Sequence, residues 1–232
     1  MSQLLNYNTR VYRKALRTLL KSPCEKNSYG ITHELLAFQM EFDPYSQIDG
    51  ASQKYIKNEL DWYRSQDLCI NGHEGFEGNK IWQKCASDEG FVNSNYGWCI
   101  YSEANSSQFE YAIESIHDNP ATKQAVMIYS RPAINVEWND NKHAKHDMLC
   151  TIYVSYLLRN GFLRAHVHMR SNDVWFGLRN DLVWQQYVLE TAVMRLNTLG
   201  ITCKPGPIIW HADSLHIYDF EVEKAQKYLG RI

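Results

Sequence analysis

The sequence predicts an α+β fold in which a mixed β-sheet is flanked by helices. Three observations support this prediction. The chain of 232 residues, 44% of them hydrophobic, is long enough to bury one sizeable core. Helical and strand-like apolar patterns alternate irregularly along it, which is typical of mixed architectures. Neither an internal repeat nor an interdomain linker interrupts them, so we expect residues 1–232 to form a single domain.

Apolar spacing predicts the elements in order. Residues 4–21 form an amphipathic helix that ends before Pro23, and Ile31–Phe42 form an apolar strand. A second helix covers residues 51–66, and the glycine-rich run 71–79 is a loop. The C-terminal half continues with a helix at 103–117, strands at 124–130, 148–158 and 163–169, a helix at 182–198, strands around Pro207–Trp210 and His216–Tyr218, and a final helix to Leu229.

Composition limits the classes of function. With 24 basic and 26 acidic residues the formal charge is −2, which gives no general attraction to nucleic acid or to an anionic membrane. The sequence has no apolar run of 18 residues and no signal-peptide core near Met1. Its six cysteines show no metal-binding spacing. We expect a cytoplasmic protein with reduced thiols, no metal, no membrane contact and no direct binding of nucleic acid.

The stretch Met169–Leu189 carries the first candidate site. An apolar strand ends there in the polar cluster Arg170–Asp173, the chain turns at Gly177, and a helical pattern begins at Leu182. Taken alone, such a stretch is more often a solvated loop. Strand, polar cluster, glycine turn and helix are nevertheless how α/β proteins present ligand-binding groups at a sheet edge.

Cys150 is the second candidate, because it stands at the start of an apolar strand. An isolated cysteine there is usually a small core residue, and a nucleophilic thiolate needs a neighbouring positive charge. Asn160-Gly161 is a strong hairpin signal between this strand and the next. The hairpin would place Cys150 and Arg170 near the same end of adjacent strands.

Several blocks resemble the thymidylate synthase family. The stretch from Arg170 to Asp181 is similar to the family signature Gln-Arg-Ser-x-Asp-x-x-Leu-Gly-x-Pro-Phe-Asn, and Cys150 keeps the family's spacing of twenty residues before Arg170. Leu-Cys-Thr replaces the usual Pro-Cys-His. Further similar blocks, between about residues 55 and 229, are Asn58–Tyr63, Ile81-Trp82, Asn95–Gly97 and Ser214–Tyr218.

This resemblance implies a fold, a cofactor and roles for individual residues. It implies a thymidylate synthase-like domain that forms a homodimer and binds 5,10-methylenetetrahydrofolate. Catalytic roles fall to Cys150, Glu59, Tyr96 and Asp181. Nucleotide contacts fall to Arg170, Ser171, Asn172, Asp181, His216 and Tyr218, with help from Lys123 and Arg131. Folate contacts fall to Trp82, Asp173 and Gly177.

Asp181 indicates which base is bound. It stands where the family signature ends in Asn, whose amide can pair with both O4 and N3–H of uracil. A carboxylate would instead face uracil O4 acceptor to acceptor, whereas cytosine offers an amino donor and an N3 that can be protonated. The Arg179–Asp181 block also resembles the phage deoxycytidylate hydroxymethylases of this family. We therefore expect dCMP as the substrate.

The phosphate ligands depart from the family pattern. Lys123 and Gln124 stand where the family has an Arg-Arg pair contributed by the partner subunit, so one charge and two bidentate groups are missing. We predict a dCMP 5-hydroxymethylase that adds water to the transferred carbon. The sequence leaves two alternatives open. One is a cytidylate 5-methyltransferase, or an enzyme acting on CMP, and the other is a non-catalytic nucleotide-binding protein of the same fold.

Overall fold

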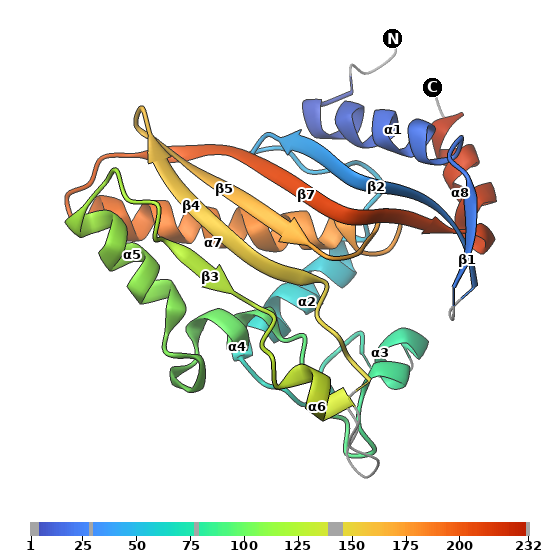
Figure 1. Cartoon of the computed structure of the whole chain (residues 1–232), viewed down its shortest axis with the longest axis horizontal. Coiled ribbons are helices and arrows are strands. Elements are labelled where there is room, and N and C mark those ends of the chain that lie inside the picture. Colours follow the sequence, from blue (N-terminus) through green and yellow to red (C-terminus); the bar gives the residue numbers. More distant parts are fainter. Residues whose placement is uncertain (1–4, 28–29, 77–78, 139–145, 231–232) are drawn as a thin grey trace. The chain divides into compact units, whose positions relative to one another are not determined.

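A computed structural model describes residues 5–27, 30–76, 79–138 and 146–230 (Figure 1). The chain forms two compact units. Unit 1 consists of Met1–Ala51 together with Tyr156–Ile232, and unit 2 consists of Ser52–Ser155.

Unit 1 is built on a twisted mixed sheet, which agrees with the predicted fold class. In spatial order β1, β2, β7 and β5 lie side by side, and β6 also pairs with β7. The β1–β2 and β2–β7 pairs are antiparallel, whereas β5 and β6 run parallel to β7. These strands are β1 (Cys24–Asn27), β2 (Gly30–Phe42), β5 (Phe162–Met169), β6 (Asn172–Asp173) and β7 (Lys204–Tyr218).

Strand β4 (Thr151–Arg159) belongs to both units, because its first half lies in unit 2 and its second half in unit 1. It is hydrogen-bonded to β5. The connection is Asn160-Gly161, with φ angles of 53° and 76°, as a two-residue turn with both central residues at positive φ requires. The predicted hairpin is confirmed.

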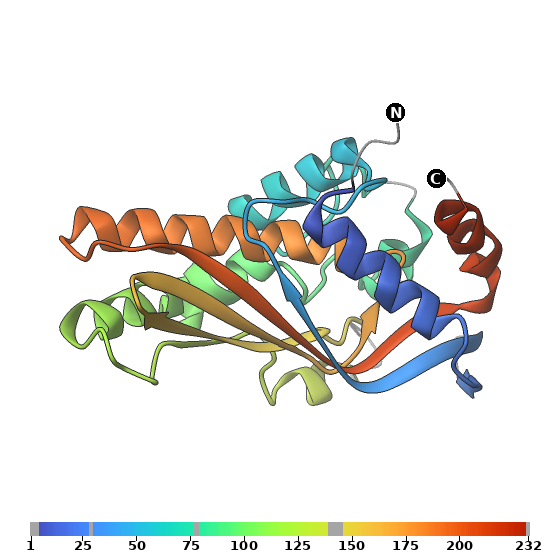
Figure 2. The same ribbon diagram turned by 90° about the horizontal axis from the view of Figure 1, so that it is seen from above.

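Three helices cover the sheet of unit 1: α1 (Tyr7–Leu19), α7 (Leu178–Thr198) and α8 (Asp219–Leu229). Asn6 caps α1, since its side-chain oxygen accepts a hydrogen bond from the backbone N–H of Thr9 at 2.8 Å. Figure 2 shows α1 and α7 on the same side of the twisted sheet. The predicted helices are confirmed, although α7 begins four residues earlier than the pattern at Leu182 indicates.

The pattern of buried positions in β7 changes opposite Ala37 of β2. Ala37 adopts a φ of 51°, and the regular β2–β7 pairing is interrupted between Leu36 and Phe38. Before this point along β7 the buried residues include Trp210 and Ala212, and after it they are Leu215 and Ile217. The intervening His216 and the following Tyr218 therefore lie on the opposite face from Leu215 and Ile217.

Unit 2 is mainly helical and has an aromatic core. Trp62 is fully buried and contacts the rings of Tyr63, Phe76 and Trp82 at centroid distances of 5.2, 4.7 and 5.2 Å. Strand β3 pairs antiparallel with the first half of β4. The elements are α2 (Gln53–Ser65), α3 (Lys80–Cys85), α4 (Tyr96–Tyr101), a 3₁₀ turn (Glu103–Asn105), α5 (Gln108–Asp118), β3 (Val126–Ile128) and α6 (Ile134–Trp138).

Most predicted elements are found, and the differences are local. The helix predicted at 103–117 is a 3₁₀ turn followed by α5, because Ser106 and Ser107 adopt left-handed conformations between them. The strand predicted at 124–130 covers only Val126–Ile128. The described part of 71–79 contains turns and no helix or strand, as expected. Short elements were missed, namely β1, β6, α3, α4 and α6.

Candidate functional site

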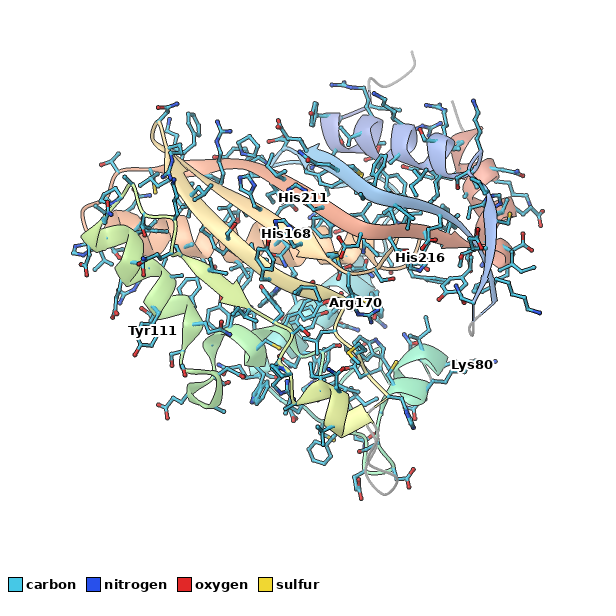
Figure 3. The ribbon with its side chains drawn as sticks, viewed as in Figure 1. Lys80, Tyr111, His168, Arg170, His211 and His216 are labelled. Atoms are coloured by element: carbon cyan, nitrogen blue, oxygen red, sulfur yellow. The ribbon has the colours of Figure 1, made fainter. Side chains whose placement is uncertain are left out.

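The polar cluster predicted after β5 lies where expected in unit 1. Met169 ends β5 and Arg170 follows it with an exposed side chain. The chain then forms the short strand β6, in which Asn172 pairs with Leu215 and Asp173 with His216 of β7. Figure 3 shows Arg170 and His216 in this region. Parallel pairing with β7 thus holds the cluster beside the predicted His-x-Tyr block.

Asn172 is buried and fixes the position of Asp181. Its side-chain nitrogen donates to Asp181 Oδ2 at 3.1 Å, and its side-chain oxygen accepts from Trp210 Nε1 at 3.2 Å. This bond assigns the oxygen and nitrogen of the amide, because an indole N–H can only donate. The amide of Asn172 therefore orients the Asp181 carboxyl.

Asp181 lies in the first turn of α7, and its carboxyl has a raised pKa. Burial raises its pKa from 3.8 to about 6, the hydrogen bond from Asn172 opposes this, and the negative charge of Asp173 adds to it. Within unit 1 the fold thus supplies a carboxyl that can gain or lose a proton near neutral pH. Such groups are common where a base or acid is needed.

Gly177 is required by the space around Asp181. A Cβ atom at this position would lie 3.0 Å from Asp181 Oδ2, 3.1 Å from the carbonyl oxygen of Asp173 and 3.3 Å from Asn172 Nδ2. The glycine therefore lets three predicted site residues approach one another at the start of α7. This packing role of Gly177 was not predicted from the sequence, which predicts only a contact with folate.

Asp173 stabilises the turn that leads into α7. Its Oδ1 accepts hydrogen bonds from the backbone N–H groups of Trp175 and Phe176 at 2.7 and 2.8 Å. Burial raises the pKa of Asp173, while these hydrogen bonds and the nearby His216 lower it. The turn places Asp173 and Asp181 close enough for their charges to interact.

His216 and Tyr218 lie on one face of β7, which confirms that part of the prediction. Their rings make an edge contact with centroids 5.4 Å apart. Ser171 Oγ lies 3.5 Å from His216 Nδ1, so the polar cluster and the His-x-Tyr block touch. Unit 1 thus brings Ser171, Asn172, Asp173, Asp181, His216 and Tyr218 together.

The predicted residues of unit 2 include a buried glutamate with an aromatic partner. Glu59 on α2 is buried, and its Oε1 accepts a hydrogen bond from the Tyr55 hydroxyl at 3.1 Å. Trp82 Nε1 on α3 donates to the same hydroxyl oxygen at 2.9 Å. Glu59 and Trp82 are thus joined through Tyr55. Tyr55 was not among the predicted site residues, although its position one helical turn before Glu59 was a usable signal.

Tyr96 is buried at the start of α4 in unit 2. Its ring stacks on Tyr63 of α2 at 5.1 Å with an interplanar angle of 16°, and it meets Tyr129 edge-on at 5.2 Å. The next residue, Gly97, approaches α2 so closely that a Cβ atom there would lie 1.8 Å from the carbonyl oxygen of Tyr63. Helices α2 and α4 are therefore packed in close backbone contact.

Cys150 is partly exposed and immediately precedes β4. The preceding Asp147 is buried and anchors the segment, because its carboxylate accepts bonds from the backbone N–H groups of Asn93 and Ser94 at 2.8 and 2.6 Å. Elsewhere in unit 2, burial raises the pKa of Cys85 to about 11 and that of Cys99 to about 12. Those two thiols are poor candidates for a nucleophile.

The two predicted phosphate contacts of unit 2 differ in their surroundings. Lys123 is exposed in the loop before β3. Arg131 follows β3, donates from Nη2 to Asn93 Oδ1 at 3.1 Å and lies over the ring of Trp98 at 5.0 Å.

The described helices include none that is long and apolar enough to cross a membrane.

Comparison with known proteins agrees with these features. The family model for thymidylate synthase matches residues 12–232. The deoxycytidylate 5-hydroxymethyltransferases of Enterobacteria phages T4 and T6 are each 44% identical to this chain over 169 residues, covering 72% of this chain and 68% of theirs. A thymidylate synthase of Fusobacterium nucleatum is 27% identical over 157 residues, covering 66% of this chain and 52% of its own length. The chain therefore belongs to the thymidylate synthase family, whose members are one-carbon transferases of nucleotide metabolism.

Proposed function

We propose that this protein is a deoxycytidylate 5-hydroxymethylase, which transfers a one-carbon unit from 5,10-methylenetetrahydrofolate to C5 of dCMP and adds water to it. The observation that carries the proposal is the carboxyl of Asp181, oriented by Asn172 and with a pKa of about 6. The 44% identity to phage enzymes named for this reaction supports it.

Asp181 would select the base by hydrogen bonding. Its carboxyl can accept from the amino group at C4 of cytosine and share a proton with N3. A pKa near neutrality suits this second task, because the proton can rest on either partner. A proton shared with N3 draws electrons from C6 and favours attack there. Uracil would place its O4 acceptor against the carboxylate.

Cys150 would start the reaction as a thiolate. C5 of cytosine is a weak nucleophile until a group adds at C6, and the bond from Sγ of Cys150 to C6 makes C5 resemble an enamine carbon. The new bond to the one-carbon unit then forms at C5. Elimination of Cys150 from C6 at the end restores the aromatic ring and frees the thiolate.

Glu59 and Tyr96 would manage the protons. The C5 hydrogen must leave after the new bond forms, and a buried carboxylate is a suitable acceptor. The bond between the one-carbon unit and the folate nitrogen must then break. The proton held by Glu59 would pass to that nitrogen, and the freed carboxylate would activate the water whose hydroxyl completes the product. Tyr96 would hold that water in place from α4.

The residues present fit the chemistry of a folate. Trp82 is partly exposed and its indole nitrogen is engaged by Tyr55, which leaves the ring for stacking on a flat pterin. Asp173 uses Oδ1 for backbone bonds, so its other oxygen can accept from pterin N–H groups. When bound, the folate would supply the one-carbon unit at C5.

The remaining residues would hold the sugar and phosphate. His216 and Tyr218 share a face of β7 and suit joint contact with one deoxyribose. Arg170 and Ser171 would bind the phosphate with help from Arg131, and Lys123 would be supplied across a homodimer interface. The enzyme would act in the cytoplasm, or in the host cytoplasm if it is viral.

Product mass tests the proposal directly. The protein is incubated with dCMP and 5,10-methylenetetrahydrofolate, and the nucleotide is measured by mass spectrometry. We expect a hydroxymethyl group on C5. A methyl group would instead indicate a methyltransferase, and an unchanged nucleotide would contradict both activities. CMP and dUMP in place of dCMP test the sugar and the base.

Exchange of Asp181 for Asn tests base selection. Asp181→Asn restores the family's usual side chain at almost constant volume, so it should lower kcat/KM for dCMP and raise it for dUMP. A buried mismatched pair changes specificity roughly ten- to a hundredfold. If the ratio of the two kcat/KM values does not move toward dUMP, Asp181 does not read the base.

A further inference from the structure

Tyr55 joins two residues to which the proposed reaction assigns separate tasks. Its hydroxyl oxygen accepts from Trp82 Nε1 at 2.9 Å, and its hydroxyl lies 3.1 Å from Glu59 Oε1. Tyr55 and Glu59 are one helical turn apart on α2, and Trp82 comes from α3. All three residues belong to unit 2.

The direction of these hydrogen bonds is fixed by the groups involved. An indole N–H can only donate, so the bond with Trp82 uses the Tyr55 oxygen as acceptor. The single hydroxyl hydrogen of Tyr55 is then directed at the carboxylate of Glu59. The chain of bonds therefore runs from Trp82 through Tyr55 to Glu59.

Two hydrogen bonds that share one direction couple Trp82 to Glu59. A hydroxyl that donates to a carboxylate favours the ionised form of that carboxylate and restricts its rotamer. The donating hydroxyl is polarised by the negative charge, and its oxygen becomes a stronger acceptor for the indole. Ionisation of Glu59 should therefore strengthen the hydrogen bond that the indole N–H of Trp82 donates.

We propose that Tyr55 is a positioning residue that holds the Glu59 carboxylate and couples its ionisation to Trp82. The catalytic consequence rests on the proposed function, because it requires Glu59 to transfer protons in that reaction. A contact made by a bound folate with Trp82 would then alter the proton affinity of Glu59 through Tyr55.

A purely structural role for Tyr55 gives different expectations. Its ring contacts Phe76 with centroids 6.3 Å apart, and phenylalanine would preserve that contact. Tyr55→Phe therefore removes the hydroxyl and retains the ring. Tyr111→Phe is the matched control, because Tyr111 is 64% exposed on α5 of the same unit and points outward in Figure 3.

Nuclear magnetic resonance of the protein without ligands tests the coupling. The seven tryptophans give few indole N–H signals, and that of Trp82 is identified by its loss in Trp82→Phe. In the parent protein and in Tyr111→Phe, we expect this signal to move with pH as Glu59 ionises. In Tyr55→Phe the signal should move upfield and lose its pH dependence.

Kinetics tests the positioning role. We expect Tyr55→Phe to lower kcat about tenfold, in line with the loss of a hydrogen bond to a charged group, and to change KM for dCMP by less than about twofold. The limb of the kcat–pH profile that reports Glu59 should move to higher pH by about one unit, because the ionised form has lost a donor.

The outcomes separate this inference from the proposed function. If the parent protein forms no product but its Trp82 signal still titrates through Tyr55, the coupling holds and the proposed function is wrong. A Trp82 signal that does not respond to pH in the parent protein overturns the coupling, even if Tyr55→Phe fails to fold. A kcat–pH profile unchanged by Tyr55→Phe overturns the positioning role.

Discussion

Replacing Asp181 by Asn removes a carboxyl that the folded protein holds in an unfavourable charge state at neutral pH. Burial raises its pKa from 3.8 to about 6, so the folded chain binds this proton more tightly than the unfolded chain does. The stabilisation from the bound proton is complete below pH 3.8 and is lost as the pH rises through 6. Above pH 6, the ionised carboxylate destabilises the fold.

The magnitude follows from the size of the shift. A rise from 3.8 to about 6 corresponds to roughly 3 kcal/mol of destabilisation at pH 7.5 and to about 1 kcal/mol at pH 4.5. Asn cannot ionise, and its side-chain oxygen can still accept from Asn172 Nδ2. Asp181→Asn should therefore raise the free energy of unfolding by up to about 3 kcal/mol at pH 7.5 and clearly less at pH 4.5.

Urea unfolding of both proteins at the two pH values measures this difference. Asp88→Asn is a suitable control, because Asp88 is exposed and a surface change of this kind alters stability by less than about 0.5 kcal/mol. A gain that is the same at pH 7.5 and pH 4.5 would show that the charge of Asp181 is not its cause. A loss of stability at pH 7.5 would refute the reasoning outright.

Further predictions concern the nucleophile, the assembly, the glycine before α7 and two histidines. Cys150→Ser should abolish turnover while calorimetry still detects dCMP binding, and retained activity would remove Cys150 from the mechanism. Sedimentation should find a symmetric homodimer, so a stable and active monomer at micromolar concentration would exclude that assembly. Gly177→Ala should lower the free energy of unfolding by about 1–3 kcal/mol, because the added Cβ meets Asp181 Oδ2 at 3.0 Å. Gly230→Ala is the control and should change this free energy little, because the nearest atom to its added Cβ is 3.6 Å away. Equal effects of the two substitutions would contradict this prediction. Burial lowers the pKa of His166 and of His168, so stability should fall as the pH drops below 6.5, and replacing both by Asn should flatten that dependence in urea unfolding.

Long periodic elements were predictable from the sequence, and short ones were not. Helix α7 and strand β2 each place many apolar side chains at regular spacing, and both were found close to their predicted bounds. Strand β6 has only two residues, which carry no periodicity, and it exists because β7 supplies its hydrogen bonds. The shift of burial along β7 occurs where its pairing with β2 is interrupted at Ala37, and no periodic pattern in the sequence of β7 marks that point.

The site was predictable in its residue types and less so in their local partners. Asp181 and His216 were identified by their place in family-like blocks, and unit 1 brings the predicted groups around them together. The orientation of Asn172 depends on Trp210, which is 38 residues away in the sequence. Tyr55 was overlooked because a tyrosine on an amphipathic helix looks like an ordinary core residue.

Gly97 shows how a packing constraint can be mistaken for a chemical one. A side chain of any size at this position would overlap the carbonyl group of Tyr63, so saturation mutagenesis with selection for activity should recover glycine alone. Because Gly97 follows Tyr96 directly, such a result would resemble the intolerance expected of a catalytic residue. Only a stability measurement on the variants would reveal that the intolerance at position 97 reflects helix spacing. Sequence comparisons that rank residues by invariance would carry the same error into any redesign of this enzyme.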